Sequence, residues 1–301
     1  MTQNEEKIEQ LSESLIDEIV GAVALPKTAF THWLGWRLFR NICRRLAEIA
    51  VPFDDIVGSE GLPAGSRWML THFCDKITAH GVENIPQTGP LLVVTNHPGS
   101  YDGMVLFSLI PRVDIRWISS EIPFLRMLPN LQENLFFSSR EDSRNRMVVL
   151  RNCIKQMQAG GVLVYFAAGH RDPDPAIYKG ASRAIEGWLD IFDVFYRYVP
   201  ELKTIPVIMS GVVDKNWSKH PLTWLRRKQI DQQRLAEFGQ VITQLLHPGK
   251  LMLSPFISFG KSYTRNELLE VSTDGTLRTA ITLKGKQLLI EHCERFGGNA
   301  G

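Results

Sequence analysis

The chain has 301 residues, enough for one large domain or two smaller ones with a substantial hydrophobic core. Its 34 Lys and Arg residues nearly balance its 32 Asp and Glu residues, which argues against a nucleic-acid-binding protein, so any basic function must be local. The four cysteines are far apart in the sequence and form no C-x-x-C motif. This pattern predicts reduced thiols in a cytoplasmic protein and no zinc site.

The first part of the chain is predicted to be helical. Residues 1–24 carry apolar side chains three to four positions apart, and their polar, acidic start is not typical of a signal peptide. Residues 32–50 predict an amphipathic helix with arginines on one side and tryptophans nearby, which suits a membrane surface or, alternatively, packing on its own domain. A glycine-rich loop is expected at 58–65. No run of about 18 apolar residues occurs, so no membrane-spanning helix is expected.

From about residue 80 the predicted strands alternate with predicted helices. A short strand and turn are expected at 77–86, strands at 90–96, 113–120, 161–169, 203–213 and 250–263, and helices at 101–110, 143–160, 181–199, 224–246 and 277–296. This alternation predicts an α/β fold with a largely parallel central sheet flanked by helices. We therefore expect a helical N-terminal layer at 1–78, with a possible membrane-interface helix, and an α/β domain at 79–301.

The segment 91–103 holds the strongest chemical signal in the chain. His97 follows a buried strand, at the carboxyl edge where α/β sheets bind ligands, and Asp102 begins the next helix. Pro98 and Gly99 allow a tight turn that brings the carboxylate to the imidazole. Such a pair supplies a general base that activates a substrate hydroxyl for direct attack on an acyl carbonyl. The alternative is that Asp102 only caps a helix and His97 is an ordinary polar residue.

Three cations follow separate predicted elements. Arg140, Arg171 and Lys179 would bind a phosphate if they converged on the edge that carries His97, and Gly169 would let the backbone approach a ligand closely. Taken singly, each cation is a solvated surface charge. The stretch GHRDPDP at 169–175 can also be interpreted as a His/Asp metal cluster. No second set of ligands is apparent, so no metal is expected.

These segments, taken in order, resemble the glycerolipid acyltransferases, the group that includes 1-acylglycerol-3-phosphate and glycerol-3-phosphate acyltransferases. The similar blocks are N-H-x-x-x-x-D at 96–102, FFSSRED at 136–142, FAAGHRD at 166–172, YKGA at 178–181, TIPVIMSG at 204–211 and ISFGKSY at 257–263. The resemblance covers about residues 80–265. It implies that His97 is the base, that Asp102 orients it, and that Arg140, with Arg171 and Lys179, binds the phosphate of the acceptor.

The resemblance also implies the reaction and its partners. An acyl group would move from acyl-CoA or acyl carrier protein to a lysophospholipid or glycerol phosphate, in phospholipid biosynthesis, without a cofactor, on the inner face of the cytoplasmic membrane. The third block departs from the family pattern Phe-Pro-Glu-Gly-Thr-Arg-Ser, because Ala168 replaces the glutamate that is thought to hold the polar head of the acceptor. The identity of the acceptor therefore stays open. One alternative is a lipid-binding protein that has lost catalysis. Another is a hydrolase that uses water in place of the acceptor, although the sequence has no G-x-S-x-G motif to supply a serine nucleophile.

Overall fold

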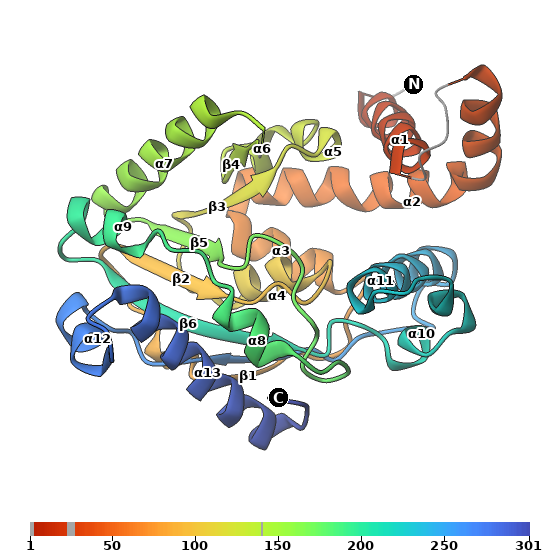
Figure 1. Ribbon diagram of the computed structural model, residues 1–301. Coiled ribbons are helices and arrows are strands. Elements are labelled where there is room, and N and C mark those ends of the chain that lie inside the picture. The colour runs from red at the N-terminus through yellow and green to blue at the C-terminus, as the bar shows by residue number, and fades with distance from the viewer. Residues whose placement is uncertain (1–2, 23–27, 140) are drawn as a thin grey trace.

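A seven-stranded sheet forms the centre of the protein, with helices on both of its faces (Figure 1). The computed structural model describes residues 3–22, 28–139 and 141–301. The strands lie in the order β1-β7-β6-β2-β5-β3-β4. Every pair of neighbouring strands is parallel except β6 and β7, which are antiparallel. The predicted α/β fold with a largely parallel sheet is therefore confirmed. The strands are β1 (Thr78–His80), β2 (Leu91–Thr95), β3 (Ile115–Ser120), β4 (Leu135–Ser138), β5 (Val162–Phe166), β6 (Lys203–Ser210) and β7 (Phe256–Phe259).

The helices range from long helices that pack against the sheet to short ones that connect other elements. They are α1 (Gln3–Ala22), α2 (Ala29–Glu60), α3 (Leu62–Leu70), α4 (Asp102–Leu109), α5 (Pro123–Arg126), α6 (Pro129–Gln132), α7 (Ser143–Gln158), α8 (Ala181–Glu186), α9 (Phe192–Tyr198), α10 (Lys215–Ser218), α11 (Gln229–Leu246), α12 (Arg265–Val271) and α13 (Leu277–Phe296), with 3-10 turns η1 (Val82–Asn84) and η2 (Pro221–Leu225). None of the described helices combines the length and apolar character that crossing a membrane requires.

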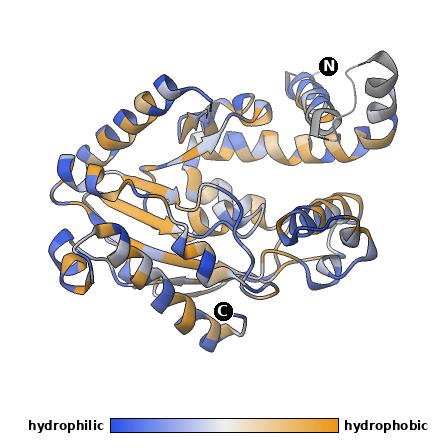
Figure 2. Cartoon of the chain, in the orientation of Figure 1, coloured by the Kyte–Doolittle hydropathy of each residue, from blue (hydrophilic) through white to orange (hydrophobic). Residues whose placement is uncertain are grey.

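The central strands are buried on both faces because their side chains alternate between two cores. In β2, Leu91 and Val93 join a cluster that includes residues of α2, α3 and α4, whereas Leu92 and Val94 join a second cluster with α9 and α13. Both β2 and β5 are strongly hydrophobic along their length (Figure 2). Burial on both sides makes this part of the sheet a firm support for the loops that follow its strands.

The N-terminal helices share a core with the sheet. Helix α1 packs along α2, and Leu11 of α1 lies in the same cluster as Phe53 of α2 and the strand residue Val93 (Figure 1). On the other side of this helix pair, Arg40 and Arg44 of α2 form ion pairs with Glu9 of α1, at 3.8 and 3.5 Å. The sequence left open whether the apolar face of residues 32–50 meets a membrane or packs internally. In this structure most of that face of α2 packs inside the protein.

The predicted glycine-rich loop at 58–65 is wrong. Helix α2 continues to Glu60, and α3 begins at Leu62. Gly58 and Gly65 are helical glycines that allow close packing, since a Cβ atom would lie 2.6 Å from the Asn130 side chain in one case and 2.5 Å from Val57 in the other. Only Gly61, with φ +88°, adopts a conformation that turns the chain.

Four further elements differ from the sequence prediction. The helix expected at 181–199 is two helices, because Gly187 ends α8 and Trp188 is fully buried against Gly285 of α13. The helix expected from residue 224 begins only at Gln229, after η2. Strand β4 and helix α12 were not predicted, because both are short and only partly buried segments without a clear period.

Candidate active site

The loop after β2 is tied to its neighbours on both sides. The Asn96 side chain donates a hydrogen bond to the Met209 carbonyl of β6 and accepts one from the Met209 N–H, each 2.9 Å long. The His97 N–H donates to Oδ2 of Asp172 at 2.8 Å, and the Asp172 N–H donates to the His97 carbonyl at 2.9 Å. These four bonds hold the backbone of His97 between β6 and the loop after β5.

His97 and Asp102 form the pair that their spacing predicted. Nδ1 of His97 lies 2.6 Å from Oδ2 of Asp102. The carboxylate also accepts from the backbone N–H groups of Gly99, at 3.0 Å, and Gly103, at 2.6 Å. The Asp102 side chain is 3% exposed and that of His97 is 31% exposed. The carboxylate is thus held in place inside the protein, while the imidazole reaches solvent.

The other ring nitrogen of His97 is available for chemistry. Within the described part of the chain, no group lies within hydrogen-bonding distance of Nε2. Phe166, the last residue of β5, packs beside the imidazole with 4.8 Å between ring centroids. The imidazole therefore lies beside an apolar ring, and with Asp102 on Nδ1 it is Nε2 that can accept a proton.

Arg171 is paired with a buried carboxylate that the sequence did not reveal. Its Nη1 lies 2.6 Å from Oε2 of Glu237, a residue of α11. Ser100, in the loop between His97 and Asp102, donates to the same Oε2 at 2.8 Å. The Glu237 side chain is only 4% exposed, and burial raises its pKa even though Arg171 acts in the opposite direction. Its other oxygen, Oε1, is buried without a partner in the described part of the chain.

Helix α11 presents a buried polar stripe to the loops of the site. Gln233, Glu237, Gln240 and Gln244 follow one another at intervals of four, three and four residues, so they share one face of the helix. Nε2 of Gln233 donates to the carbonyls of Pro98, at 2.5 Å, and of Asp172, at 2.9 Å. Gln233 therefore joins the loop after β2 to the loop after β5. In the sequence this stripe is indistinguishable from a solvent-facing polar surface, which is why it was missed.

The aspartates of the GHRDPDP stretch bind backbone groups. Asp174 is fully buried and accepts hydrogen bonds from the N–H groups of Gly211, Val212 and Val213 after β6 and of Ala176, at 2.9 to 3.1 Å. Burial raises the pKa of Asp172 to about 6. Nowhere in residues 3–22, 28–139 and 141–301 do three potential metal ligands lie together. These carboxylates organise the loops.

The other expected site residues are Gly169, Lys179 and Arg140, and none of them has a described contact with His97 or Asp102. Gly169 has φ +66° at the exposed turn after β5. Lys179 is exposed, and its carbonyl accepts a hydrogen bond of 3.0 Å from Gln229 at the start of α11. Arg140 lies outside the described residues. The structure thus brings His97, Asp102 and Arg171 together and connects Lys179 to the same helix α11 through its backbone.

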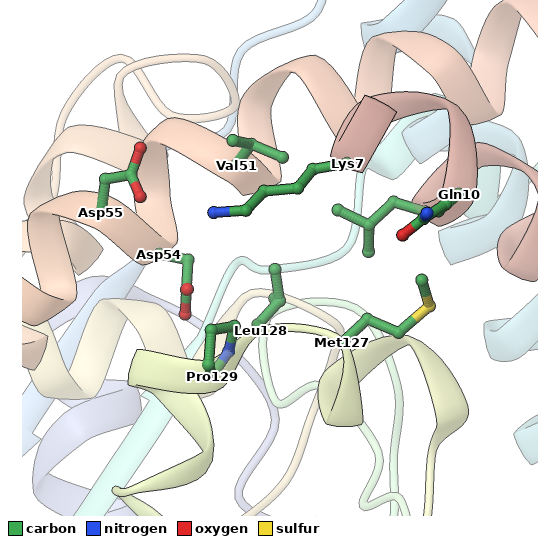
Figure 3. A pocket seen from close by; sticks show the side chains of 9 residues that line it. Lys7, Gln10, Val51, Asp54, Asp55, Met127, Leu128 and Pro129 are labelled. Atoms are coloured by element: carbon green, nitrogen blue, oxygen red, sulfur yellow. The ribbon is translucent and has the colours of Figure 1, made fainter. Parts of the chain in front are cut away.

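Two surface pockets lie away from these residues. One, of about 40 Å³, is enclosed by α1, α2 and the α5–α6 turn, with Lys7, Asp54 and Asp55 among its lining side chains (Figure 3). The other, of about 420 Å³, lies between the α8–α9 segment and the start of α13. Neither is lined by His97 or Arg171.

A parallel α/β domain with a partly exposed imidazole and a buried carboxylate at the end of a central strand is an arrangement that can activate a hydroxyl. The family model described as Acyltransferase matches residues 76–210, the stretch from β1 to β6. This match confirms the resemblance found in the sequence: residues 76–210 are similar to the acyltransferase family, and the protein is an enzyme that transfers acyl groups. Helix α11, which carries Glu237, lies outside the matched stretch.

One solved structure with a similar chain is the 1-acyl-sn-glycerophosphate (LPA) acyltransferase PlsC from Thermotoga maritima. It is 15% identical, with 96% of this chain and 98% of that chain covered and a TM-score of 0.43. No curated protein sequence matches the chain.

Proposed function

We propose that the protein transfers a fatty acyl group from acyl-CoA or acyl carrier protein to a hydroxyl of a phosphate-bearing glycerolipid acceptor, either a lysophospholipid or glycerol phosphate. The observation that carries this proposal is the 2.6 Å contact between His97 Nδ1 and Asp102 Oδ2 at the carboxyl end of β2. The reaction would take place on the inner face of the cytoplasmic membrane, where a lipid acceptor is held.

The pair accounts for the chemistry without a protein nucleophile. Asp102 accepts the Nδ1–H of His97, so Nε2 removes the proton from the acceptor hydroxyl as its oxygen attacks the thioester carbonyl. The tetrahedral intermediate then expels the thiolate, which takes the proton from Nε2, and the ester remains on the acceptor. Asp102 stabilises the imidazolium between these steps. A general base of this kind contributes about 10²- to 10⁴-fold in rate.

Acceptor recognition is assigned to the loops around this pair. Arg171 and Ser100 lie on the two loops that the His97–Asp172 bonds join, so both are near the base in the fold. We assign the phosphate of the acceptor to Arg171, with Arg140 and Lys179 as further contacts, and the close backbone approach to Gly169. Ala168 cannot accept a hydrogen bond through its side chain, and we assign the contact with the polar head of the acceptor to Ser100, whose hydroxyl lies beside Arg171.

The test is acyl transfer by the purified protein. Acyl-CoA and acyl-carrier-protein thioesters are combined with lysophosphatidic acid or glycerol 3-phosphate, and both thiol release and ester formation are measured. His97→Ala should lower turnover about 10²- to 10⁴-fold. His170→Ala is the matched control, since that imidazole is exposed and hydrogen-bonds only the backbone carbonyl of Arg171 within the described chain.

Each alternative has its own outcome. Equal turnover in wild type and His97→Ala removes the proposed base. A protein that binds lipid but releases no thiol with any donor and acceptor is a binding protein that has lost catalysis. Thiol release that does not depend on the acceptor, with free fatty acid as the product, identifies a hydrolase.

A further inference from the structure

The turn η2 holds large apolar side chains out into solvent. Trp224 is 71% exposed, Leu225 76% and Leu222 49%. Between them, Thr223 is almost completely buried. Trp side chains are usually well covered in folded proteins, so three large apolar residues together on one short turn form an unpartnered surface.

This turn is a fixed part of the fold. The Thr223 hydroxyl donates to the His220 carbonyl at 2.7 Å, and its carbonyl accepts from the Arg226 N–H at 3.0 Å. Just before it, the Trp217 ring packs directly on Gly239 of α11, where a Cβ atom would overlap with it, and Nε1 of Trp217 donates to Thr243 at 3.1 Å. The exposed side chains are therefore presented by an anchored element.

The same segment concentrates positive charge. Residues 215–230 contain five Lys or Arg residues and no Asp or Glu, whereas the whole chain has a net charge of only +2. The five are Lys215, Lys219, Arg226, Arg227 and Lys228, and all are exposed. In the described part of the chain, no carboxylate lies within ion-pairing distance of any of them. Exposed Trp and Leu side chains beside unpaired cations match the interface of a bilayer that contains anionic lipids.

Helix α2, for which the sequence left a membrane surface and internal packing open, is less suited to this role. Its Arg40 and Arg44 are paired with Glu9, and Arg44 is also paired with Glu48 at 3.0 Å. The Arg40 guanidinium covers the Trp36 ring, 4.7 Å from its centroid. Arg40 and Arg44 of α2 are thus paired with carboxylates within the protein, unlike the cations that follow η2.

We propose that Leu222, Trp224, Leu225, Arg226, Arg227 and Lys228 form a docking surface for a bilayer with anionic headgroups. The apolar side chains enter the interfacial region, and the cations contact lipid phosphates. This inference rests on the proposed function, because a membrane-borne acceptor must reach His97. The docking surface leads directly into α11, whose Gln229 binds the Lys179 carbonyl and whose Glu237 binds Arg171, so docking would place the acceptor-binding loops close to the lipid surface.

The test measures binding to vesicles separately from catalysis. Full-length wild type, Trp224→Ser/Leu225→Ser and Arg226→Gln/Arg227→Gln/Lys228→Gln are sedimented with phosphatidylcholine vesicles, with or without phosphatidylglycerol. The control is Met147→Ser/Val148→Ser, which removes another pair of exposed apolar side chains, 61% and 54% exposed, near the arginines of α7. Acyl transfer to glycerol 3-phosphate, which needs no membrane, is measured for all four proteins.

The wild type should prefer the anionic vesicles. The charge variant should lose about 100-fold in partitioning, on the basis of about 1 kcal/mol per cation, and the Ser variant about tenfold. The control should bind like the wild type, and all four should transfer acyl groups to glycerol 3-phosphate equally.

Three results would overturn the proposal: undiminished vesicle binding by both docking-surface variants, an equal loss in the control, or binding of acyl carrier protein but not vesicles through this surface. Absence of acyl transfer by the wild type to glycerol 3-phosphate and to lysophosphatidic acid, with vesicle binding lost only in the docking-surface variants, would refute the proposed function and leave the docking surface standing.

Discussion

Arg171, in the loop after β5, forms an ion pair with Glu237 of helix α11, with 2.6 Å between Nη1 and Oε2. The positive charge that the sequence assigned to phosphate binding is therefore already opposed by a buried carboxylate. A phosphate at Arg171 must compete with Glu237, and this competition is open to measurement.

Glu237→Gln should tighten binding of a phosphate-bearing acceptor. Glutamine keeps an oxygen that accepts from Arg171 and Ser100 but removes the negative charge. The KM for lysophosphatidic acid should fall by up to about tenfold, the effect of about 1.4 kcal/mol of relieved repulsion, with little change in kcat. The KM for a neutral monoacylglycerol, measured in parallel, should not change. Equal shifts for both acceptors would show that Glu237 only maintains the structure.

Arg171→Gln should destabilise the fold as well as weaken acceptor binding. It leaves the Glu237 carboxylate buried and unpaired, which costs about 3–5 kcal/mol. The double variant Arg171→Gln/Glu237→Gln should recover most of the lost free energy of unfolding, measured by urea denaturation. A double variant no more stable than Arg171→Gln would mean that the ion pair contributes little.

Asp102→Asn should lower kcat by about 10²- to 10⁴-fold. Asparagine fills the same space, but its amide favours the wrong tautomer of His97. The control is Asp142→Asn, because Asp142 also stands at the start of a helix, where it accepts from the N–H groups of Arg144 and Asn145. If Asp102 were only a helix cap, both substitutions would leave kcat nearly intact and differ only in stability.

Asp172→Asn should alter the pH dependence of stability. Burial raises the pKa of Asp172 from 3.8 to about 6. Between these values the folded protein holds a proton that the unfolded chain has released, so the contribution of Asp172 to wild-type stability falls as pH rises. The free energy of unfolding of the variant, minus that of the wild type, should therefore increase by about 2 kcal/mol from pH 4 to pH 6. A flat difference across this range would show that Asp172 titrates normally.

Much of the fold could be predicted from the sequence, because its main signals are local. The apolar run of β2 and the periodicity of α7 and α13 each depend on neighbouring residues only, and the alternation of strands with helices led to a parallel sheet. The glycines at 58 and 65 misled the prediction, since a helical glycine that admits a neighbouring side chain has the same sequence as one that turns the chain.

In the candidate site, too, local contacts could be predicted from the sequence and distant ones could not. His97 and Asp102 are five residues apart across a Pro-Gly turn, so the sequence alone determined that the two side chains could meet. Only the tertiary structure decided that Glu237 pairs with Arg171, 66 residues away, and that Gln233 joins two loops of the site. The physical reason is that a short turn restricts the chain to few arrangements, whereas the partner of a distant polar side chain depends on how whole helices pack against the sheet.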